Sequence, residues 1–244
     1  MNGKLAAIWG SPGSGKTTLT VKIAKNLAEF KQNIIIVGCD SDIPLLPVLA
    51  PSQDSHSSIG ELASQNLSSI SILKRCIPVN NSKYISTLGY KLGDNISLYP
   101  KFSQSDAENL FSQLTEIADF VLVDCVTNSS NDNLINAAIE TANIIFNVGT
   151  PSIKSVVFYQ SKNHYYRMEK HNVEQINIVN NIFSYQDEGI ISEVMGGVSY
   201  SFYHVPGLME QFDSGLLLEP VFGKNARQYE FQMKRMVNKL FFDL

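Results

Sequence analysis

An eight-residue segment near the start of the chain has the residue types and spacing that bind phosphate. Residues 10–17 read Gly-Ser-Pro-Gly-Ser-Gly-Lys-Thr, which fits the pattern Gly-x-x-x-x-Gly-Lys-Ser/Thr. Glycines let backbone N–H groups approach phosphate oxygens, and a following helix N-terminus adds its dipole. In this pattern Lys16 reaches the β- and γ-phosphates, and the Thr17 hydroxyl is a Mg²⁺ ligand. The segment predicts a site for a nucleoside triphosphate with Mg²⁺. The alternative is a glycine-rich turn that binds nothing.

Carboxylates follow two apolar runs further along the chain. Asp124 ends the run 120–123, and Asp40 and Asp42 follow the β-branched run 34–37. At the end of a strand beside the phosphate loop, Asp124 is expected to hold Mg²⁺ directly or through water. Asp40 is expected to face the γ-phosphate and orient the attacking water. A plain cap or turn role is the alternative for each, and more so for Asp42.

Strand-like and helix-like patterns alternate along most of the chain. The predicted strands are residues 5–9, 34–37, 120–123, 144–148, 176–179 and 200–204. The predicted helices are residues 18–30, 105–118, 133–142, a helix beginning near Pro151, and about 228–242, with a capping box at Ser105. Repeated strand–helix units predict an α/β protein with the three-layer P-loop NTPase fold, in which helices cover both faces of a mostly parallel sheet.

The stretch from about 52 to 100 departs from this alternation and is rich in Ser and Asn. Short helices are predicted near 58–65 and 70–75, and a hairpin is predicted to pair 84–88 with 96–99 across a turn at 93–95. We expect a single P-loop NTPase domain over residues 1–244, with this stretch as an insertion.

Composition excludes several classes of protein. Of the 244 residues, 44% are hydrophobic and 17% charged, as in globular rather than disordered chains. The net charge of −4 gives no global basic field and argues against DNA as a partner. No apolar run reaches the ~18–20 residues of a membrane-spanning helix. The N-terminus lacks the pattern of a signal peptide, and the three cysteines form no CxxC pair. A cytoplasmic location is therefore expected.

Together these motifs resemble the MinD/ParA group of P-loop ATPases, within the wider class shared with signal-recognition-particle GTPases. The resemblance covers nearly the whole chain except about 52–100. Residues 37–42, Val-Gly-Cys-Asp-Ser-Asp, resemble the group's first switch, and residues 119–124 resemble its Walker B strand. The resemblance implies that Asp40 positions water and that Asn180, at the end of a predicted strand, contacts the base. A turn role at the strand end is the alternative for Asn180.

Two segments near the C-terminus resemble the pilus-localising branch of this group, called TadZ or CpaE. They are residues 204–206, His-Val-Pro, and 212–215, Phe-Asp-Ser-Gly. The resemblance implies a protein partner in a pilus, secretion or positioning machine. The predicted catalytic residues are Lys16 and Asp40; the nucleotide-binding residues are Gly10, Gly13, Ser14, Gly15, Lys16, Thr17, Thr18, Asn180 and Pro206; the metal ligands are Thr17 and Asp124.

The sequence departs from the group's pattern in two places. The group's signature lysine, five residues before the P-loop lysine, is Ser11 here, and residues 126–128 replace the group's usual proline pair. In the group that lysine crosses the dimer interface to the partner's phosphates. Ser11 has a short neutral side chain, so we expect slow hydrolysis and either a monomer or a homodimer indifferent to nucleotide. Lys154 is a possible substitute cation.

The predicted function is an ATP- and Mg²⁺-binding switch that positions or assembles a larger machine. Residues 180–183 lack the [NT]KxD motif that reads guanine, which favours ATP over GTP. A nucleotide-binding scaffold with little hydrolysis and a small-molecule kinase are the alternatives. The kinase is disfavoured because the chain has few arginines, and no two lie close in sequence: Arg75, Arg167, Arg227 and Arg235.

The C-terminal segment carries an apolar stripe at helical spacing. It consists of Tyr229, Met233, Met236, Leu240 and Leu244, with Lys234, Arg235 and Lys239 lying off it. One interpretation is a membrane-contacting amphipathic helix, as in MinD. The other, which is favoured because Asp243 is adverse to an anionic surface, is a final helix packed on the sheet.

Overall fold

The computed structural model describes residues 3–49, 51, 53, 56–64, 67–80, 82–94, 97, 99–127, 132–167 and 173–243. Within these ranges eight strands form one sheet in the order β3-β4-β2-β5-β1-β6-β7-β8. All neighbours are parallel except β3 and β4. The strands are β1 Lys4–Gly10, β2 Ile34–Gly38, β3 Ile77–Pro78, β4 Ile85–Gly89, β5 Phe120–Asp124, β6 Ile144–Gly149, β7 Glu174–Ile182 and β8 Tyr200–Tyr203.

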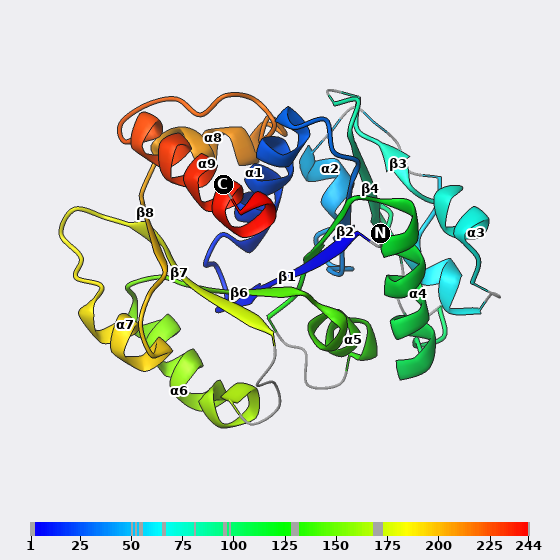
Figure 1. Ribbon diagram of the computed structural model, residues 1–244, viewed down its shortest axis with the longest axis horizontal. Helices are drawn as coiled ribbons and strands as arrows, with labels where there is room; N and C mark the ends of the chain where they lie inside the picture. Colours follow the sequence, from blue (N-terminus) through cyan, green and yellow to red (C-terminus); the bar gives the residue numbers. More distant parts are fainter. Residues whose placement is uncertain are drawn as a thin grey trace.

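Helices cover both faces of this sheet (Figure 1). One face carries α1 Lys16–Glu29, α2 Leu45–Leu49, α8 Pro206–Asp213 and α9 Ala226–Phe242. The other carries α4 Gln104–Ile117, α5 Asn133–Thr141, α6 Ile153–Arg167 and α7 Gly189–Met195, with the short η1 Ile59–Ser64 and α3 Ser69–Leu73 beside α4. The predicted three-layer fold is confirmed.

Alternation along β1 shows why its sequence is a continuous apolar run. Ala6 and Ile8 belong to the hydrophobic core under α1 and α9, whereas Leu5, Ala7 and Trp9 belong to the core under α4 and α5. Because successive side chains of a strand point to opposite faces, a strand covered on both sides has no polar positions. The parallel order brings the carboxyl ends of β1, β2, β5 and β7 to one edge of the sheet, where the predicted site lies.

The stretch from 52 to 100 contributes strands to the sheet. β4 pairs in parallel with β2, and its other neighbour is β3, in antiparallel pairing. The predicted hairpin between 84–88 and 96–99 is therefore wrong, because both edges of β4 are occupied; residues 95, 96 and 98 lie outside the described residues.

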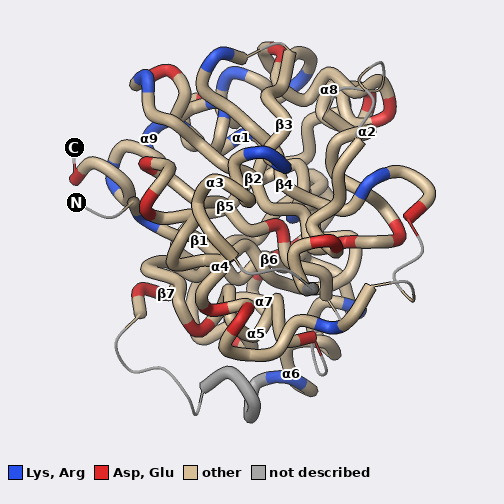
Figure 2. The backbone as a smooth tube through the Cα atoms, turned by 90° about the vertical axis from the view of Figure 1, so that its right-hand side faces the viewer, with Lys and Arg blue, Asp and Glu red and all other residues tan. Residues whose placement is uncertain are grey.

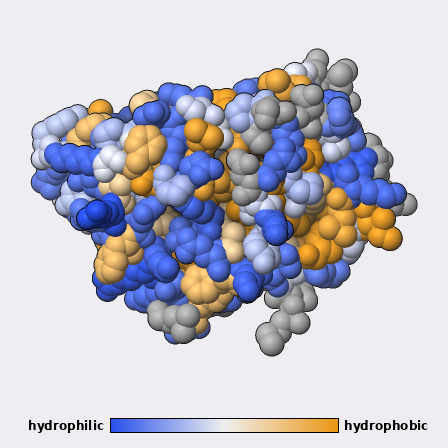
Figure 3. Space-filling view, turned by 90° about the horizontal axis from the view of Figure 1, so that it is seen from above, coloured by the Kyte–Doolittle hydropathy of each residue, from blue (hydrophilic) through white to orange (hydrophobic). Residues whose placement is uncertain are grey.

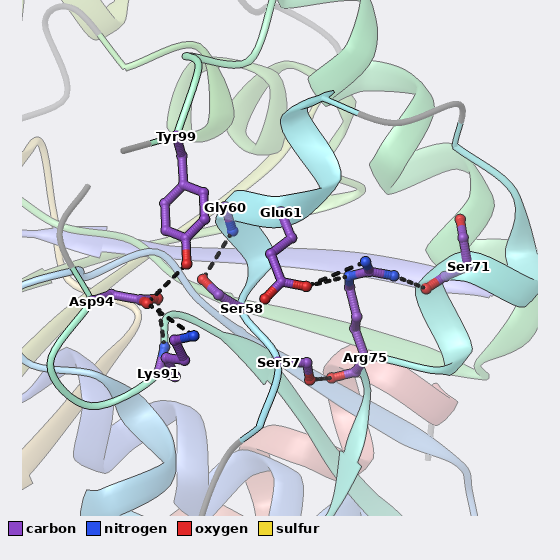
Figure 4. Close-up of polar contacts among 9 residues, drawn as sticks. All are labelled: Ser57, Ser58, Gly60, Glu61, Ser71, Arg75, Lys91, Asp94 and Tyr99. Carbon is purple, nitrogen blue, oxygen red and sulfur yellow. Dashed lines mark hydrogen bonds and ion pairs between the residues drawn. The ribbon is translucent and has the colours of Figure 1, made fainter. Parts of the chain in front are cut away.

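Polar contacts close this stretch on itself (Figure 4). Arg75 forms an ion pair with Glu61 at 3.2 Å. The Tyr99 hydroxyl donates to Asp94 at 2.9 Å, and Asp94 also accepts from the backbone N–H of Lys91 at 2.9 Å. The ion pair joins two parts of the chain that precede β3, and the Asp94 contacts join the chain after β4 to itself.

Local details differ from the sequence prediction at two helices. Helix α4 is capped by Ser103, whose hydroxyl accepts from the N–H of Asp106, and not by Ser105. Helix α9 has the predicted apolar stripe, but its members Tyr229, Met233 and Met236 are buried in the core against α1 and the sheet. The packed interpretation of this helix therefore holds for the described residues.

The surface carries both charge signs and scattered apolar side chains. Lys and Arg are interspersed with Asp and Glu along the backbone (Figure 2). Viewed from above, apolar side chains form separate groups between polar ones (Figure 3). In the described part of the chain, no helix is both long and apolar enough to cross a membrane.

Candidate functional site

The phosphate loop occupies the turn between β1 and α1. Gly13 and Gly15 have φ angles of 71° and 83°, in the left-handed region that favours glycine. A Cβ on Gly13 would meet nothing within 4 Å, so the loop is open above it, whereas a Cβ on Gly15 would lie 2.6 Å from Nδ2 of Asn180. The loop is therefore open on its outer side and closely packed on the side of β7.

The Lys16 ammonium group is folded over this loop. Its Nζ donates to the Thr127 hydroxyl at 2.8 Å and to the carbonyl oxygens of Ser11 at 3.1 Å and Gly10 at 3.4 Å. Burial lowers the pKa of Lys16, and the nearby Asp124, Cys125 and Asp40 oppose that shift. Such a partly desolvated cation is well placed to exchange these neutral acceptors for phosphate oxygens.

Thr17 and Asp124 form the second half of the site. The Thr17 hydroxyl donates to Oδ2 of Asp124 at 2.6 Å, across 107 residues of sequence. Asp124 is 8% exposed, and burial raises its pKa to about 6, while the Thr17 hydrogen bond and Lys16 act in the opposite direction. These two side chains fit the expected Mg²⁺ position, because in P-loop proteins such a pair completes its coordination with phosphate oxygens and water.

No richer metal-binding set is present in the described ranges. They contain no group of three or more His, Cys, Asp or Glu side chains that could hold a metal ion. A cation at Thr17 and Asp124 would therefore depend on the phosphates for most of its ligands, which makes metal and nucleotide binding mutually dependent.

Asp40 lies at the same edge of the sheet, after β2. Its Oδ1 accepts from the backbone N–H groups of Asp42 at 2.9 Å and Ile43 at 3.0 Å, which is the turn role considered from sequence. Its charge also acts on Lys16 and Asp124. One carboxylate oxygen is thus committed to the turn. Asp42 is exposed.

The remaining predicted residues occupy the side of the loop toward β6 and β7. Asn180 is 8% exposed, and its Nδ2 donates to the carbonyl oxygen of Ser14 at 2.9 Å. The Ser14 hydroxyl is buried without a hydrogen-bond partner among the described residues, which fits a loop that receives a polar ligand. Thr18 is half-buried in the first turn of α1. Pro206 begins α8 after β8, and β8 is three strands from β1 in the sheet.

Ser11 points away from the loop interior. It is buried, and its hydroxyl lies 2.5 Å from the hydroxyl of Ser155 at the start of α6. Ser155 also accepts from the N–H of Thr150 at 3.0 Å. Lys154, the neighbour of Ser155, is exposed on α6. Ser11 is thus part of a hydroxyl cluster that ties the loop to α6.

Sequence reasoning missed Thr127, Thr150 and Ser155. Thr127 and Ser155 contact the loop from distant parts of the chain, the Lys16–Thr127 contact across 111 residues and the Ser11–Ser155 contact across 144, and Thr150 contacts Ser155. Thr127 lies in the segment 126–128 that departs from the group's pattern, but that departure did not indicate a contact with Lys16. Thr150 and Ser155 lie in no pattern with a mechanistic meaning.

A strand, a glycine-rich loop and a helix at the centre of a parallel sheet, with Lys16 and Thr17 beside a strand-end aspartate, define the P-loop NTPase fold. The model of the CobQ/CobB/MinD/ParA nucleotide binding domain family matches residues 5–185. The chain belongs to this family. A search of curated proteins finds no match.

Solved structures support the fold. A ParA family ATPase from Chlorobium tepidum has a TM-score of 0.79 at 13% identity, over 96% of this chain and 99% of its own. The septum site-determining protein MinD of Pyrococcus horikoshii, in complex with Mg-ADP, gives 0.76 at 15%, over 98% of each chain. A MinC:MinD cell division complex from Aquifex aeolicus gives 0.74 at 16%, over 96% of this chain and 95% of its own.

Proposed function

We propose that this chain binds ATP with Mg²⁺ and acts as a nucleotide switch that positions or assembles a larger machine. The observation that carries the proposal is the 2.6 Å contact between Thr17 and Asp124 beside the Lys16 ammonium group, in a chain of this family. We further propose that residues 1–244 form one nucleotide-binding domain, with about 52–100 as an insertion.

The site residues divide the work of binding. Backbone N–H groups of the loop and of the first turn of α1 would face the phosphates, and Lys16 would neutralise the β- and γ-phosphates. Thr17 and Asp124 would hold Mg²⁺, which would stabilise negative charge on the phosphates. Adenine is the favoured base because residues 180–183 lack the guanine-reading motif and the similar Pyrococcus horikoshii structure is a complex with Mg-ADP.

Turnover is expected to be slow and to depend on Asp40. Replacing Asp40 with alanine should leave MgATP affinity within about threefold of wild type and remove most hydrolysis, because the carboxylate orients water and does not bind phosphate. Calorimetry and phosphate release measure the two effects. Asp42→Ala is the matched control and should retain both. Equal loss of binding and turnover in Asp40→Ala would contradict this division, and a wild type without MgATP binding would refute the proposed function.

The partner machine is a finer part of the proposal. Residues 204–206 and 212–215 resemble the TadZ/CpaE branch, which favours a cytoplasmic protein that acts on a pilus or secretion system. The Aquifex aeolicus MinC:MinD complex is a precedent for a protein partner on this fold. Genes for a secretion ATPase and pilins beside this one would support the assignment.

Association is expected to be indifferent to nucleotide. The Ser11 hydroxyl is engaged with Ser155 and has no charge with which to reach a second protein's phosphates. Because a ligand shifts an equilibrium only through its differential affinity for two states, nucleotide should not change the association constant. Sedimentation with ATP, ADP and no nucleotide, using the Asp40→Ala variant to preserve ATP, tests this.

The contrary result would be a dimer that forms with ATP alone. Association tightened tenfold or more, about 1.4 kcal/mol of coupling, would require a substitute cation at the interface. The exposed Lys154 next to Ser155 is the first candidate, and Lys154→Ala should then abolish the effect.

A further inference from the structure

The position of the metal ligands sets the direction in which a bound nucleotide extends. Strand β1 lies between β5, which carries Asp124, and β6. The γ-phosphate belongs on the β5 side, because Mg²⁺ is held by Thr17 and Asp124 there. The nucleoside must then extend toward β6, β7 and β8, where Asn180 contacts the loop.

Planar side chains lie at the end of β7 on this side. The Phe183 ring is stacked on the His204 ring, with centroids 4.1 Å apart and an interplanar angle of 20°. Phe183 is three residues after Asn180, within about 11 Å along the chain. Both rings are half-buried, so neither is sealed in the core.

Two backbone contacts and two ring contacts hold His204 in place. Its backbone N–H donates to the carbonyl oxygen of Ile182 at 2.8 Å, and its carbonyl oxygen accepts from Asn225 Nδ2 at 2.9 Å. The ring packs on Phe183, and Nδ1 lies 2.6 Å from Oδ1 of Asn181. Asn181 itself has a φ of 58°, a left-handed conformation that Asn tolerates better than most residues.

The contact with Asn181 determines what the ring can offer a ligand. A carbonyl oxygen only accepts hydrogen bonds, so Nδ1 carries the proton, and Nε2 of the neutral ring is left as an acceptor. Within the described ranges the structure shows no partner for Nε2. A ring held in place with Nε2 as an acceptor can recognise a hydrogen-bond donor on a ligand.

We propose that His204 determines base specificity, with its ring and Phe183 forming one wall of the base site and Nε2 accepting a hydrogen bond from the exocyclic amino group of adenine. Guanine presents a carbonyl oxygen at that position and would face Nε2 acceptor to acceptor. The inference rests on the proposed ATP function. It adds a reason for selecting ATP that the absent guanine motif alone does not supply.

The test compares Mg-ATP, Mg-GTP and Mg-tripolyphosphate, which has no base, by equilibrium titration. His204→Phe keeps a stacked ring and removes the acceptor. It should weaken ATP about fivefold to tenfold, leave tripolyphosphate unchanged and bind GTP at least as tightly as wild type. His204→Ala should weaken both nucleotides and spare tripolyphosphate. Asn181→Gly, which suits the backbone angle, should reduce the ATP:GTP ratio because the Nδ1 proton is no longer fixed. Tyr203→Ala, on the neighbouring exposed side chain, is the control and should change none of these.

The outcomes separate the two proposals. If tripolyphosphate binds and His204→Phe keeps the wild-type ATP:GTP ratio, the inference is overturned while the phosphate site stands. If wild type binds neither ATP nor tripolyphosphate, the proposed function fails and the inference fails with it. Loss of tripolyphosphate affinity in the His204 variants would also overturn the inference, since it would show an effect on the loop and not on the base.

Discussion

Replacing Lys16 with alanine should weaken MgATP binding by about 100-fold or more. The ammonium group is the cation that the structure places over the phosphate loop, where its present acceptors are one hydroxyl and two carbonyl oxygens. Hydrogen bonds to charged groups contribute ~1.5–3 kcal/mol each, so losing contacts to two phosphates accounts for this factor. Calorimetric titration of MgATP measures it directly.

The fold should survive this change. Burial lowers the pKa of Lys16, which means that the fold holds the charged form at a cost, and removing the charge relieves that cost. The matched control is Lys25→Ala, further along α1 and away from the loop, which should bind MgATP like wild type. If Lys16→Ala retains affinity within about threefold, the ligand does not bind in this loop, and the proposed site is wrong.

Predictions from sequence succeeded where a local pattern has one physical cause. The runs in β1, β2 and β5 are continuously apolar because helices cover both faces of the sheet, and the P-loop pattern places its own lysine and threonine. The position of Asp124 could be predicted because a strand end next to the loop is a consequence of parallel order, and its role as a metal ligand stays a prediction. Each of these follows from neighbours in sequence together with a general rule of topology.

The features that the sequence did not predict depend on contacts between distant parts of the chain. The partner of β4 is β3 and not a following strand, because the opposite edge of β4 belongs to β2, which lies about 50 residues earlier. Helix α4 could begin at either of two serines, and Ser103 is the one whose hydroxyl meets the N–H of Asp106. For Ser11 the sequence indicated only that the group's lysine is missing. Its contact with Ser155 could not be predicted, because the two residues are 144 positions apart.

A buried lysine in α1 is the most consequential feature that the sequence concealed. Lys22 is 1% exposed, although lysine in an amphipathic helix normally reaches solvent. Its Nζ lies 2.8 Å from Oε1 of Gln211, 2.5 Å from the carbonyl oxygen of Leu217 and 3.0 Å from that of Glu219. Gln211, itself 2% exposed, donates to the carbonyl oxygen of Pro220 at 2.7 Å.

These contacts connect the helix of the phosphate loop to the segment between α8 and α9. Leu217 and Glu219 are in the chain that joins those two helices. Their carbonyl groups, which contact Lys22, are removed from water. A buried acceptor without a donor costs ~1–3 kcal/mol, so the amine is needed where it lies. Lys22 therefore holds the segment between α8 and α9 against α1.

Replacing Lys22 with methionine, which keeps the length of the side chain, should lower the free energy of unfolding by about 3 kcal/mol. Burial is the main cause that lowers the pKa of Lys22 from 10.5 to about 7, with Lys25 adding to it. Between these two values the unfolded chain binds the proton and the folded protein does not, so the Lys22 contribution to stability rises with pH from about 7 to 10. The difference in the free energy of unfolding between wild type and Lys22→Met, measured by urea unfolding at pH 6, 7.5 and 9, should therefore grow as pH rises.

Lys25→Met, on the same helix and half-buried, is the control, and its free energy of unfolding should differ from that of wild type by no more than about 0.5 kcal/mol. A Lys22→Met variant as stable as wild type at pH 9 would show that the carbonyl groups find other donors and that the lysine is dispensable to the fold.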